Sequence, residues 1–199
     1  MSKCYWPNNS IYFLTGSTFL HFPYFKDYDQ KEIVLDQIKK VKNQLGIPVI
    51  AYSIAINHYH LKVYLRDGLD LKKIKQLIHG GVSHEYRKHY IKKYKKTWQS
   101  SKALVINNKF ADLVTTGYII GNLLKHNEVS TFRELEDNPF SSYCFFKEKH
   151  GDEQSRNLVY NVININENAE GIINVKDLSK TKVFKPSTSS LEQSRKKVE

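Results

Sequence analysis

Two short patterns in this sequence place chemically capable side chains at regular spacings, and the first is a pair of histidines. His58 and His60 are two residues apart in a predicted strand, so both imidazoles point to the same face. Two neutral imidazoles on one face can bind a single divalent ion. A histidine on a strand is more often a half-buried hydrogen-bonding residue, so the pair alone leaves both interpretations open.

The second pattern joins a tyrosine to an asparagine on one face of a predicted helix. Tyr118 and Asn122 are four residues apart, which is the spacing of neighbours on a helix surface. A tyrosine hydroxyl can attack a phosphodiester and form a covalent phosphotyrosine. Its pKa of about 10 means that the attack needs help, such as a metal ion on the phosphate. Asn122 could supply a third metal ligand beside the histidines, although a core tyrosine with an incidental asparagine fits the same spacing.

The rest of the chain predicts the scaffold that positions these residues. The order β-α-β-β-α-β, followed by a helix, matches the ferredoxin-like split βαβ arrangement of the α+β class. It predicts an antiparallel sheet with helices packed on one face. Gly80 and Gly81 are expected to break or kink the second helix. Hydrophobic periodicity and turn residues predict strands at 10–16, 49–56, 58–65 and 103–106, and helices at 29–45, 71–96 and 111–126.

The character of the chain changes after about Phe146, where the polar residues become more frequent. We predict a catalytic domain over residues 1–149 and a C-terminal extension over residues 150–180. Residues 181–199 are rich in Ser, Thr and Lys, which predicts a disordered tail.

The charge of the chain indicates a polyanionic partner. The 199 residues include 31 Lys or Arg and 20 Asp or Glu, a formal net charge of +11 at pH 7. Each basic side chain brought to a phosphate releases counterions, which favours binding to nucleic acid and argues against a small neutral substrate. No apolar run approaches the roughly 18 residues of a membrane span. The only cysteines, Cys4 and Cys144, lie far apart and fit a reducing cytosol.

Basic residues gather on the predicted helix 71–96 and at its end. They could track phosphates, while exposed aromatic residues between them could stack on unpaired bases. The helical spacing of the tyrosines in this segment, Tyr86, Tyr90 and Tyr94, places most of them in the core. His79, His84 and His89 share this helix and are interpreted as surface or DNA-contacting residues. The predicted DNA-binding residues are Lys72, Lys73, Lys75, Arg87, Lys88, Lys92, Lys93, Lys95 and Lys96.

The residues around both patterns resemble the IS200-like transposases that use a single tyrosine, the Y1 branch of the HUH nucleases. The run Ala51–Leu61 (AYSIAINHYHL) resembles their signature strand pair, most closely that of the REP-associated tyrosine transposases. The run Gly117–Asn122 (GYIIGN) resembles the helix that carries the nucleophile, and Asn138–Tyr143 (NPFSSY) resembles a closing segment. The resemblance extends from about Ser10 to Phe146.

This resemblance implies a DNA nickase and strand transferase. In that family the residues at these positions act as metal ligands, here His58, His60 and Asn122, and as the nucleophile, here Tyr118. The resemblance further implies Mg²⁺ or Mn²⁺ as cofactor, single-stranded DNA with a hairpin as substrate, and a 5′-phosphotyrosine intermediate. It implies a monomer or homodimer in the bacterial or archaeal cytosol, associated with the nucleoid and not with a membrane.

Four positions depart from the family pattern. Ile56 and Leu123 stand where prolines are usual, Gly117 where an arginine is usual, and Phe140 where a tryptophan is usual. These departures bear on which DNA the protein recognises and on whether the DNA element that encodes it is still mobile. The four chemical positions are intact.

Three other functions fit parts of the sequence. A relative that binds hairpins in DNA or RNA without catalysis would keep its binding after loss of Tyr118. A replication or relaxation initiator of the wider HUH class would use the same chemistry, but such proteins often carry further domains for which 199 residues leave no room. A metal-binding protein without a nucleic-acid role is disfavoured by the charge.

Overall fold

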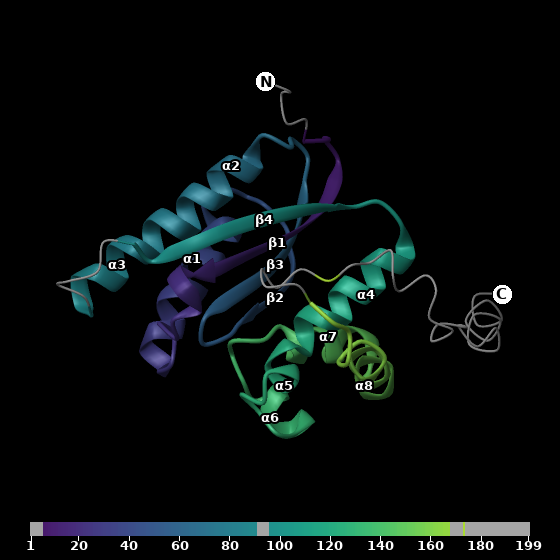
Figure 1. The fold of residues 1–199 in the computed structure, drawn as a ribbon. Coiled ribbons are helices and arrows are strands. Elements are labelled where there is room, and N and C mark those ends of the chain that lie inside the picture. The colour runs from purple at the N-terminus through teal and green to yellow at the C-terminus, as the bar shows by residue number, and fades with distance from the viewer. Residues whose placement is uncertain (1–5, 91–95, 168–172, 174–199) are drawn as a thin grey trace.

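Four antiparallel strands form one sheet in the computed structural model, which describes residues 6–90, 96–167 and 173. Along the sheet the strands follow the order β2-β3-β1-β4, so β1 and β3 are central and bonded on both sides (Figure 1). This is the order of a split βαβ fold, and the predicted α+β class and antiparallel sheet are confirmed. The strands are β1 (Ser10–Thr18), β2 (Val49–Ile54), β3 (His58–Leu65) and β4 (Trp98–Ile106).

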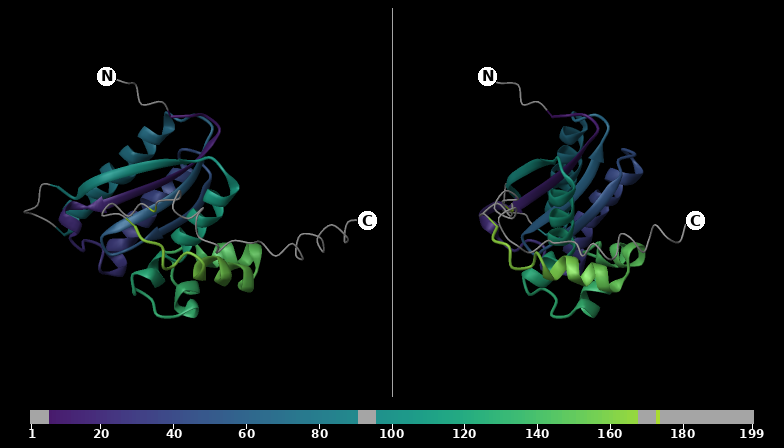
Figure 2. Two further views of the ribbon diagram at one scale, coloured as in Figure 1. Left: turned by 45° about the vertical axis from the view of Figure 1, so that its right-hand side comes forward. Right: turned by 90° about the vertical axis from the view of Figure 1, so that its right-hand side faces the viewer.

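The helices cover both faces of this sheet (Figures 1 and 2). One face carries α1 (Tyr28–Asn43) and the run formed by α2 (Asp70–Lys75), the π-helical turn η2 (Gln76–Gly80) and α3 (Gly81–His89). The two helical segments of the split βαβ unit therefore share one face, as the sequence predicts. The helix that follows them, α4 (Lys109–Ile120), crosses the opposite face.

Shorter helices continue the chain beyond α4. They are α5 (Asn122–Lys125), α6 (Phe132–Glu136), α7 (Tyr143–His150) and α8 (Asp152–Tyr160). A short 3-10 turn, η1 (Phe19–His21), directly follows β1. The predicted tail, residues 181–199, lies outside the described residues. Within the described ranges, no helix combines the length and the apolar character needed to cross a membrane.

The two glycines beside Tyr118 allow α8 to pack closely on α4. A Cβ atom on Gly117 would lie 2.8 Å from Leu158, and one on Gly121 would lie 2.5 Å from Val159. These glycines therefore serve the approach of another helix, which offsets the roughly 1 kcal/mol that each costs inside or beside a helix.

The interruption expected at Gly80 and Gly81 is present, while several predicted boundaries differ from the structure. The second helix is interrupted by the π-helical turn before Gly81, where a Cβ atom would lie 2.3 Å from the Gln37 side chain, so α3 approaches α1 closely. Strand β4 starts at Trp98 and not at residue 103. It lies at a sheet edge, where polar residues face outward and hide the alternating pattern. The last helix ends at Ile120, because Gly121 breaks it before α5 begins.

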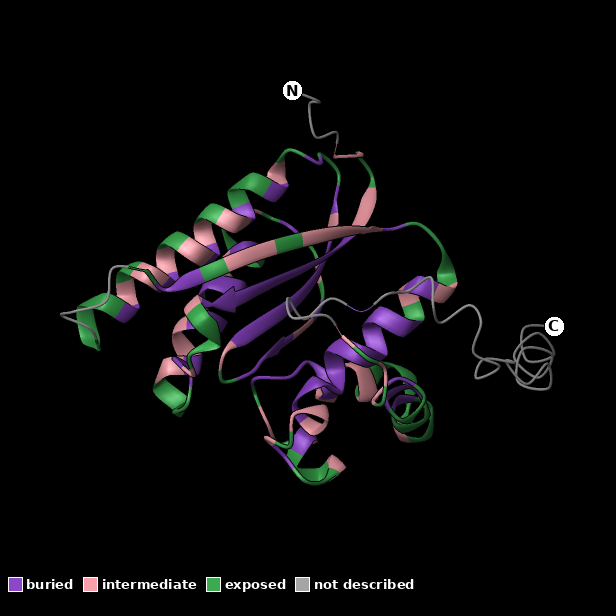
Figure 3. Ribbon diagram, in the orientation of Figure 1, coloured by how far each residue is buried: buried purple, intermediate pink, exposed green. Residues whose placement is uncertain are grey.

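Strand β3 divides its side chains between two very different faces, and the strand is buried along almost its whole length (Figure 3). Tyr59, Leu61 and Val63 join the apolar core under α1, α2 and α3. The alternate residues His58, His60 and Lys62 face α4 and are buried as well. A buried polar group needs a partner, so the polar residues of this second face are candidates for a functional site.

Candidate active site on the sheet face under α4

The two histidines of β3 lie side by side beneath α4 and α5. His60 pairs with Thr15 of β1 and Ser53 of β2, which fixes it in the middle of the sheet. The centroids of the His58 and His60 rings are 4.8 Å apart. The period of the strand thus places both imidazoles on one face, as predicted.

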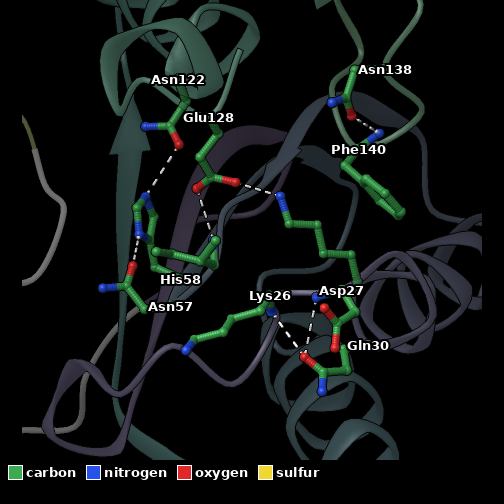
Figure 4. A network of polar contacts seen from close by, with 11 residues as sticks. Lys26, Asp27, Gln30, Asn57, His58, Asn122, Glu128, Asn138 and Phe140 are labelled. Carbon is green, nitrogen blue, oxygen red and sulfur yellow. Dashed lines mark hydrogen bonds and ion pairs between the residues drawn. The ribbon is translucent and has the colours of Figure 1, made fainter.

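A polar network holds the turn between β2 and β3, from which His58 emerges (Figure 4). The Ile56 amide donates to Glu128 Oε1 at 2.9 Å, and the other Glu128 oxygen forms an ion pair with the buried Lys31. His58 Nδ1 lies 2.7 Å from Asn57 Oδ1. The side chain of Glu128, which follows α5, therefore anchors the turn that orients His58.

Tyr118 and Asn122 reach the same place from above the sheet. Asn122 Oδ1 lies 3.2 Å from His58 Nε2, although Gly121 breaks the helix between Tyr118 and Asn122. The Tyr118 ring lies with its centroid 5.1 Å from that of His60 and packs edge-on against Phe13. The structure therefore brings together all four residues that the sequence singles out.

Several buried polar atoms at this point lack a protein partner. Within the described part of the chain, neither ring nitrogen of His60 nor the Asn122 amide nitrogen has a hydrogen-bond partner. When Nδ1 of His58 donates to Asn57, the Nε2 atom of His58 carries a lone pair and is an acceptor. It then faces the Asn122 carbonyl oxygen, which is an acceptor as well. Unsatisfied buried polar atoms cost free energy, and a cation would satisfy the acceptors among them, which are the imidazole lone pairs and the Asn122 carbonyl oxygen. The donor set of two imidazoles and an amide oxygen therefore fits a divalent ion.

Burial keeps both imidazoles in the form that binds metal. It lowers the pKa of His58 to about 3 and holds the pKa of His60 well below its ordinary value. Both rings are therefore neutral near pH 7, with a lone pair available to a cation. No group of three or more His, Cys, Asp or Glu side chains within residues 6–90, 96–167 and 173 has the arrangement of a metal site. A site here thus depends on the amide of Asn122 as its third protein ligand.

Two residues that the sequence analysis assigned no role also reach this site. The His126 ring centroid lies 4.8 Å from that of His58, and its Nε2 lies 3.4 Å from Glu167 Oε1. The other Glu167 oxygen accepts a hydrogen bond from the Tyr118 hydroxyl. His126 continues the four-residue spacing from Tyr118 and Asn122, which is a usable signal. Glu167 lies 49 residues after Tyr118, and no local pattern links the two.

The structure does not bring the predicted DNA-binding residues to the four site residues. The basic residues of α2 and α3 lie on the helices that cover the opposite face of the sheet. Lys73 pairs with Asp70 at 2.8 Å, and the Arg87 side chain donates to the Ser83 carbonyl. Lys72, Lys73, Arg87, Lys88 and Lys96 are exposed and Lys75 is half-buried, while Lys92, Lys93 and Lys95 lie outside the described residues.

His79 is not the surface residue that the sequence analysis expected. Its ring stacks on Trp98 with centroids 4.4 Å apart, and its Nε2 lies 3.0 Å from the Tyr59 hydroxyl. Burial lowers the pKa of His79 to about 4. Gly16 makes room for it, since a Cβ atom there would lie 2.8 Å from the ring. His79 therefore belongs to the packing under α2 and α3.

Comparison with known proteins places this geometry in a family. The model of the family described as "Transposase IS200 like" matches residues 21–121. A solved REP-associated tyrosine transposase bound to a REP hairpin is 19% identical, with a TM-score of 0.62 over 87% of this chain and 99% of that one. That likeness shows a shared fold.

Two further solved structures are more distant. A putative transposase from Deinococcus radiodurans is 14% identical, with a TM-score of 0.41 over 58% of this chain and 90% of that one. A tRNA(His) guanylyltransferase from Saccharomyces cerevisiae is 11% identical, with a TM-score of 0.39 over 88% and 94%. No curated protein sequence matches significantly. Since the family model spans half of the 199 residues, the chain belongs to the IS200-like transposase family.

Proposed function

We propose that this transposase is a metal-dependent, single-stranded DNA endonuclease and strand transferase that cuts near DNA hairpins through a 5′-phosphotyrosine at Tyr118. The observation that carries the proposal is the convergence of Tyr118 with His58, His60 and Asn122 on one buried sheet face. Family membership supports transposase chemistry in general, and the proposal locates that chemistry at these four residues.

Each of the four residues has a distinct role in this proposal. His58, His60 and Asn122 would hold Mg²⁺ or Mn²⁺, which supplies charge neutralisation at the scissile phosphate when it is bound. Tyr118 supplies the nucleophilic oxygen, and its contacts with His60 and Phe13 orient the ring. A covalent intermediate retains the energy of the phosphodiester bond, which allows rejoining to a second DNA end.

The proposed substrate rests on charge and on the related structure. The solved relative is bound to a REP hairpin, and the present chain carries a net charge of +11. A basic protein binds a phosphate backbone through counterion release, and unpaired DNA leaves its bases open to stacking. We therefore propose a single-stranded substrate that contains a hairpin, bound in part by the exposed basic residues of α2 and α3.

A covalent-adduct assay tests this function. The full chain is incubated with labelled single-stranded hairpin DNA and Mn²⁺ or Mg²⁺, and the products are separated on denaturing gels. We expect a metal-dependent adduct in wild type and in the control Tyr160→Phe, whose side chain is exposed and packs on Phe132. We expect none in Tyr118→Phe or in the double variant His58→Ala, His60→Ala.

Other outcomes would redirect the assignment. DNA binding without any adduct in wild type would favour a non-catalytic hairpin-binding protein. An adduct that persists in Tyr118→Phe would place the nucleophile on another tyrosine.

A further inference from the structure

The C-terminal extension returns to the site through one carboxylate, Glu167. After α8 the chain passes beside α5, where Lys125 Nζ donates to the carbonyl oxygens of Ile163, at 3.3 Å, and Ile165, at 2.5 Å. Glu167 then forms an isolated antiparallel bridge with Ile173, which is buried in the core. These contacts hold the backbone before Glu167 and at Glu167 itself.

The two oxygens of Glu167 have different partners. Oε2 accepts the hydrogen bond of the Tyr118 hydroxyl, while Oε1 lies 3.4 Å from His126 Nε2. The Glu167 side chain is 22% exposed and the whole of Tyr118 is 2% exposed. The carboxylate is thus aimed at the hydroxyl from a largely buried position, with the His126 imidazole beside it.

A proton acceptor is the one role that the proposed function leaves open. Tyrosine is a poor nucleophile until its proton is removed, and an effective general base must lie within hydrogen-bonding distance of that proton. His58 and His60 are committed to the proposed metal site. Among the described residues, Glu167 is the carboxylate that accepts the hydrogen bond of the Tyr118 hydroxyl.

We infer that Glu167 is the catalytic base that takes the proton of Tyr118 when the hydroxyl attacks DNA. The inference rests on the proposed function and deepens it, because it names the group that activates the nucleophile. Tyr118 Oη bonds to phosphorus, the bond from phosphorus to the 3′-oxygen breaks, and the hydroxyl proton moves to Glu167 Oε2. The departing 3′-oxygen takes a proton from water. During rejoining, a DNA 3′-hydroxyl bonds to phosphorus and gives its proton to water, the bond from phosphorus to Tyr118 Oη breaks, and Glu167 returns its proton to the tyrosine oxygen.

The surroundings of Glu167 suit this exchange near neutral pH. Burial raises the pKa of Glu167 to about 7, so its two protonation states are close in free energy under ordinary conditions. The titratable groups that face it are Tyr118, His126 and Lys125, and burial lowers the pKa of both His126 and Lys125. Tyr118 is buried here, so its neighbours must shift to admit a phosphodiester.

The test measures single-turnover adduct formation by the full chain on the hairpin DNA described above. Glu167→Gln keeps the size of the side chain but removes its basicity, and the exposed Glu153→Gln of α8 is the matched control. We expect the adduct rate at pH 8 to fall roughly 10²-fold in Glu167→Gln and to stay unchanged in Glu153→Gln. The wild-type rate should rise with pH through about 7, and that rise should disappear in Glu167→Gln.

A second variant separates a base from a purely structural residue. Formate, a small carboxylate, should restore part of the adduct rate in Glu167→Ala and should not accelerate Glu167→Gln. An equal or higher rate in Glu167→Gln would overturn the inference, because it would mean that Glu167 only covers the nucleophile. Absence of the adduct in wild type would instead contradict the proposed function itself, so the two failures are distinguishable.

Discussion

The two faces of the central sheet differ in how completely their buried groups are satisfied. Under α1, α2 and α3, strand β3 contributes Tyr59, Leu61 and Val63 to a continuous apolar core, and His79, whose ring packs there, is stacked and hydrogen-bonded. Under α4, the same strand contributes His58, His60 and Lys62. Lys62 is fully paired to α4 through Asp112 and Thr116, whereas His60 has no partner within the described residues.

This contrast separates residues that stabilise the fold from residues that are kept for chemistry. Apolar burial is the main favourable term in folding, so the face with the complete core carries the stability. A buried imidazole without a partner costs stability, and such groups persist where a ligand or reaction uses them. Adjacent residues of one strand should therefore respond to substitution in opposite ways.

The largest expected effect comes from the apolar face. Leu61→Ala should lower the free energy of unfolding by about 2–5 kcal/mol, because it removes buried methyl groups and leaves a cavity. His60→Leu replaces an unpartnered polar ring with an apolar side chain of similar volume. It should change the free energy of unfolding by less than about 1 kcal/mol, or raise it, while abolishing the DNA adduct. Urea denaturation in EDTA measures both, and a larger loss in His60→Leu would break the comparison.

A somewhat smaller effect concerns His79, whose ring packs on the apolar face. Its folded pKa of about 4 lies below the unfolded value of about 6.5. Between these values the unfolded chain binds more protons, so stability is complete above pH 6.5 and is lost as the pH falls to about 4. The loss due to His79 reaches roughly 3 kcal/mol.

His79→Gln should flatten this dependence. Denaturation curves at pH 7.5, 6 and 5 for wild type and variant give the difference, which cancels the shared contribution of the other buried histidines. Parallel curves for the two proteins would show that His79 is not buried as neutral imidazole.

Metal binding should stabilise the protein through the polar face alone. A divalent ion at 100 times its dissociation constant adds about 2.7 kcal/mol to the free energy of unfolding. We expect Mn²⁺ to raise the melting temperature of wild type and of Leu61→Ala, and to leave the double variant His58→Ala, His60→Ala unchanged. Equal stabilisation of that double variant would place the ion elsewhere.

The smallest effect tests whether DNA also contacts the helices of the apolar face. Lys72 is exposed on α2, and Lys149 is exposed on α7 and serves as the control. Lys72→Ala should weaken hairpin binding only slightly and reduce the slope of log affinity against log salt by about 1. Fluorescence anisotropy over a salt series measures this slope. An unchanged slope in Lys72→Ala, or the same reduction in Lys149→Ala, would indicate that α2 does not contact the DNA.

Much of the site follows from local periodicity. A strand alternates its side chains, so His58 and His60 had to share a face once the strand was recognised. The spacing of Tyr118 and Asn122 predicted a shared helix face, and their proximity survives the break at Gly121, since Asn122 still reaches His58. The prediction that His79 is a surface or DNA-contacting residue was wrong, because its burial depends on Trp98 and Gly16, which are both distant in sequence.

The sequence by itself determined the succession of strands and helices along the chain, the polar and apolar faces of β3 and the basic charge, since these follow from backbone geometry and composition. Only the tertiary structure decided which helix covers which face. Packing of α8 against Gly117 and Gly121 supports α4 over the histidines, and the chain beyond α8 carries Glu167 to Tyr118. Such contacts join residues far apart in the chain, and their free energy comes from shape and burial that no local pattern encodes.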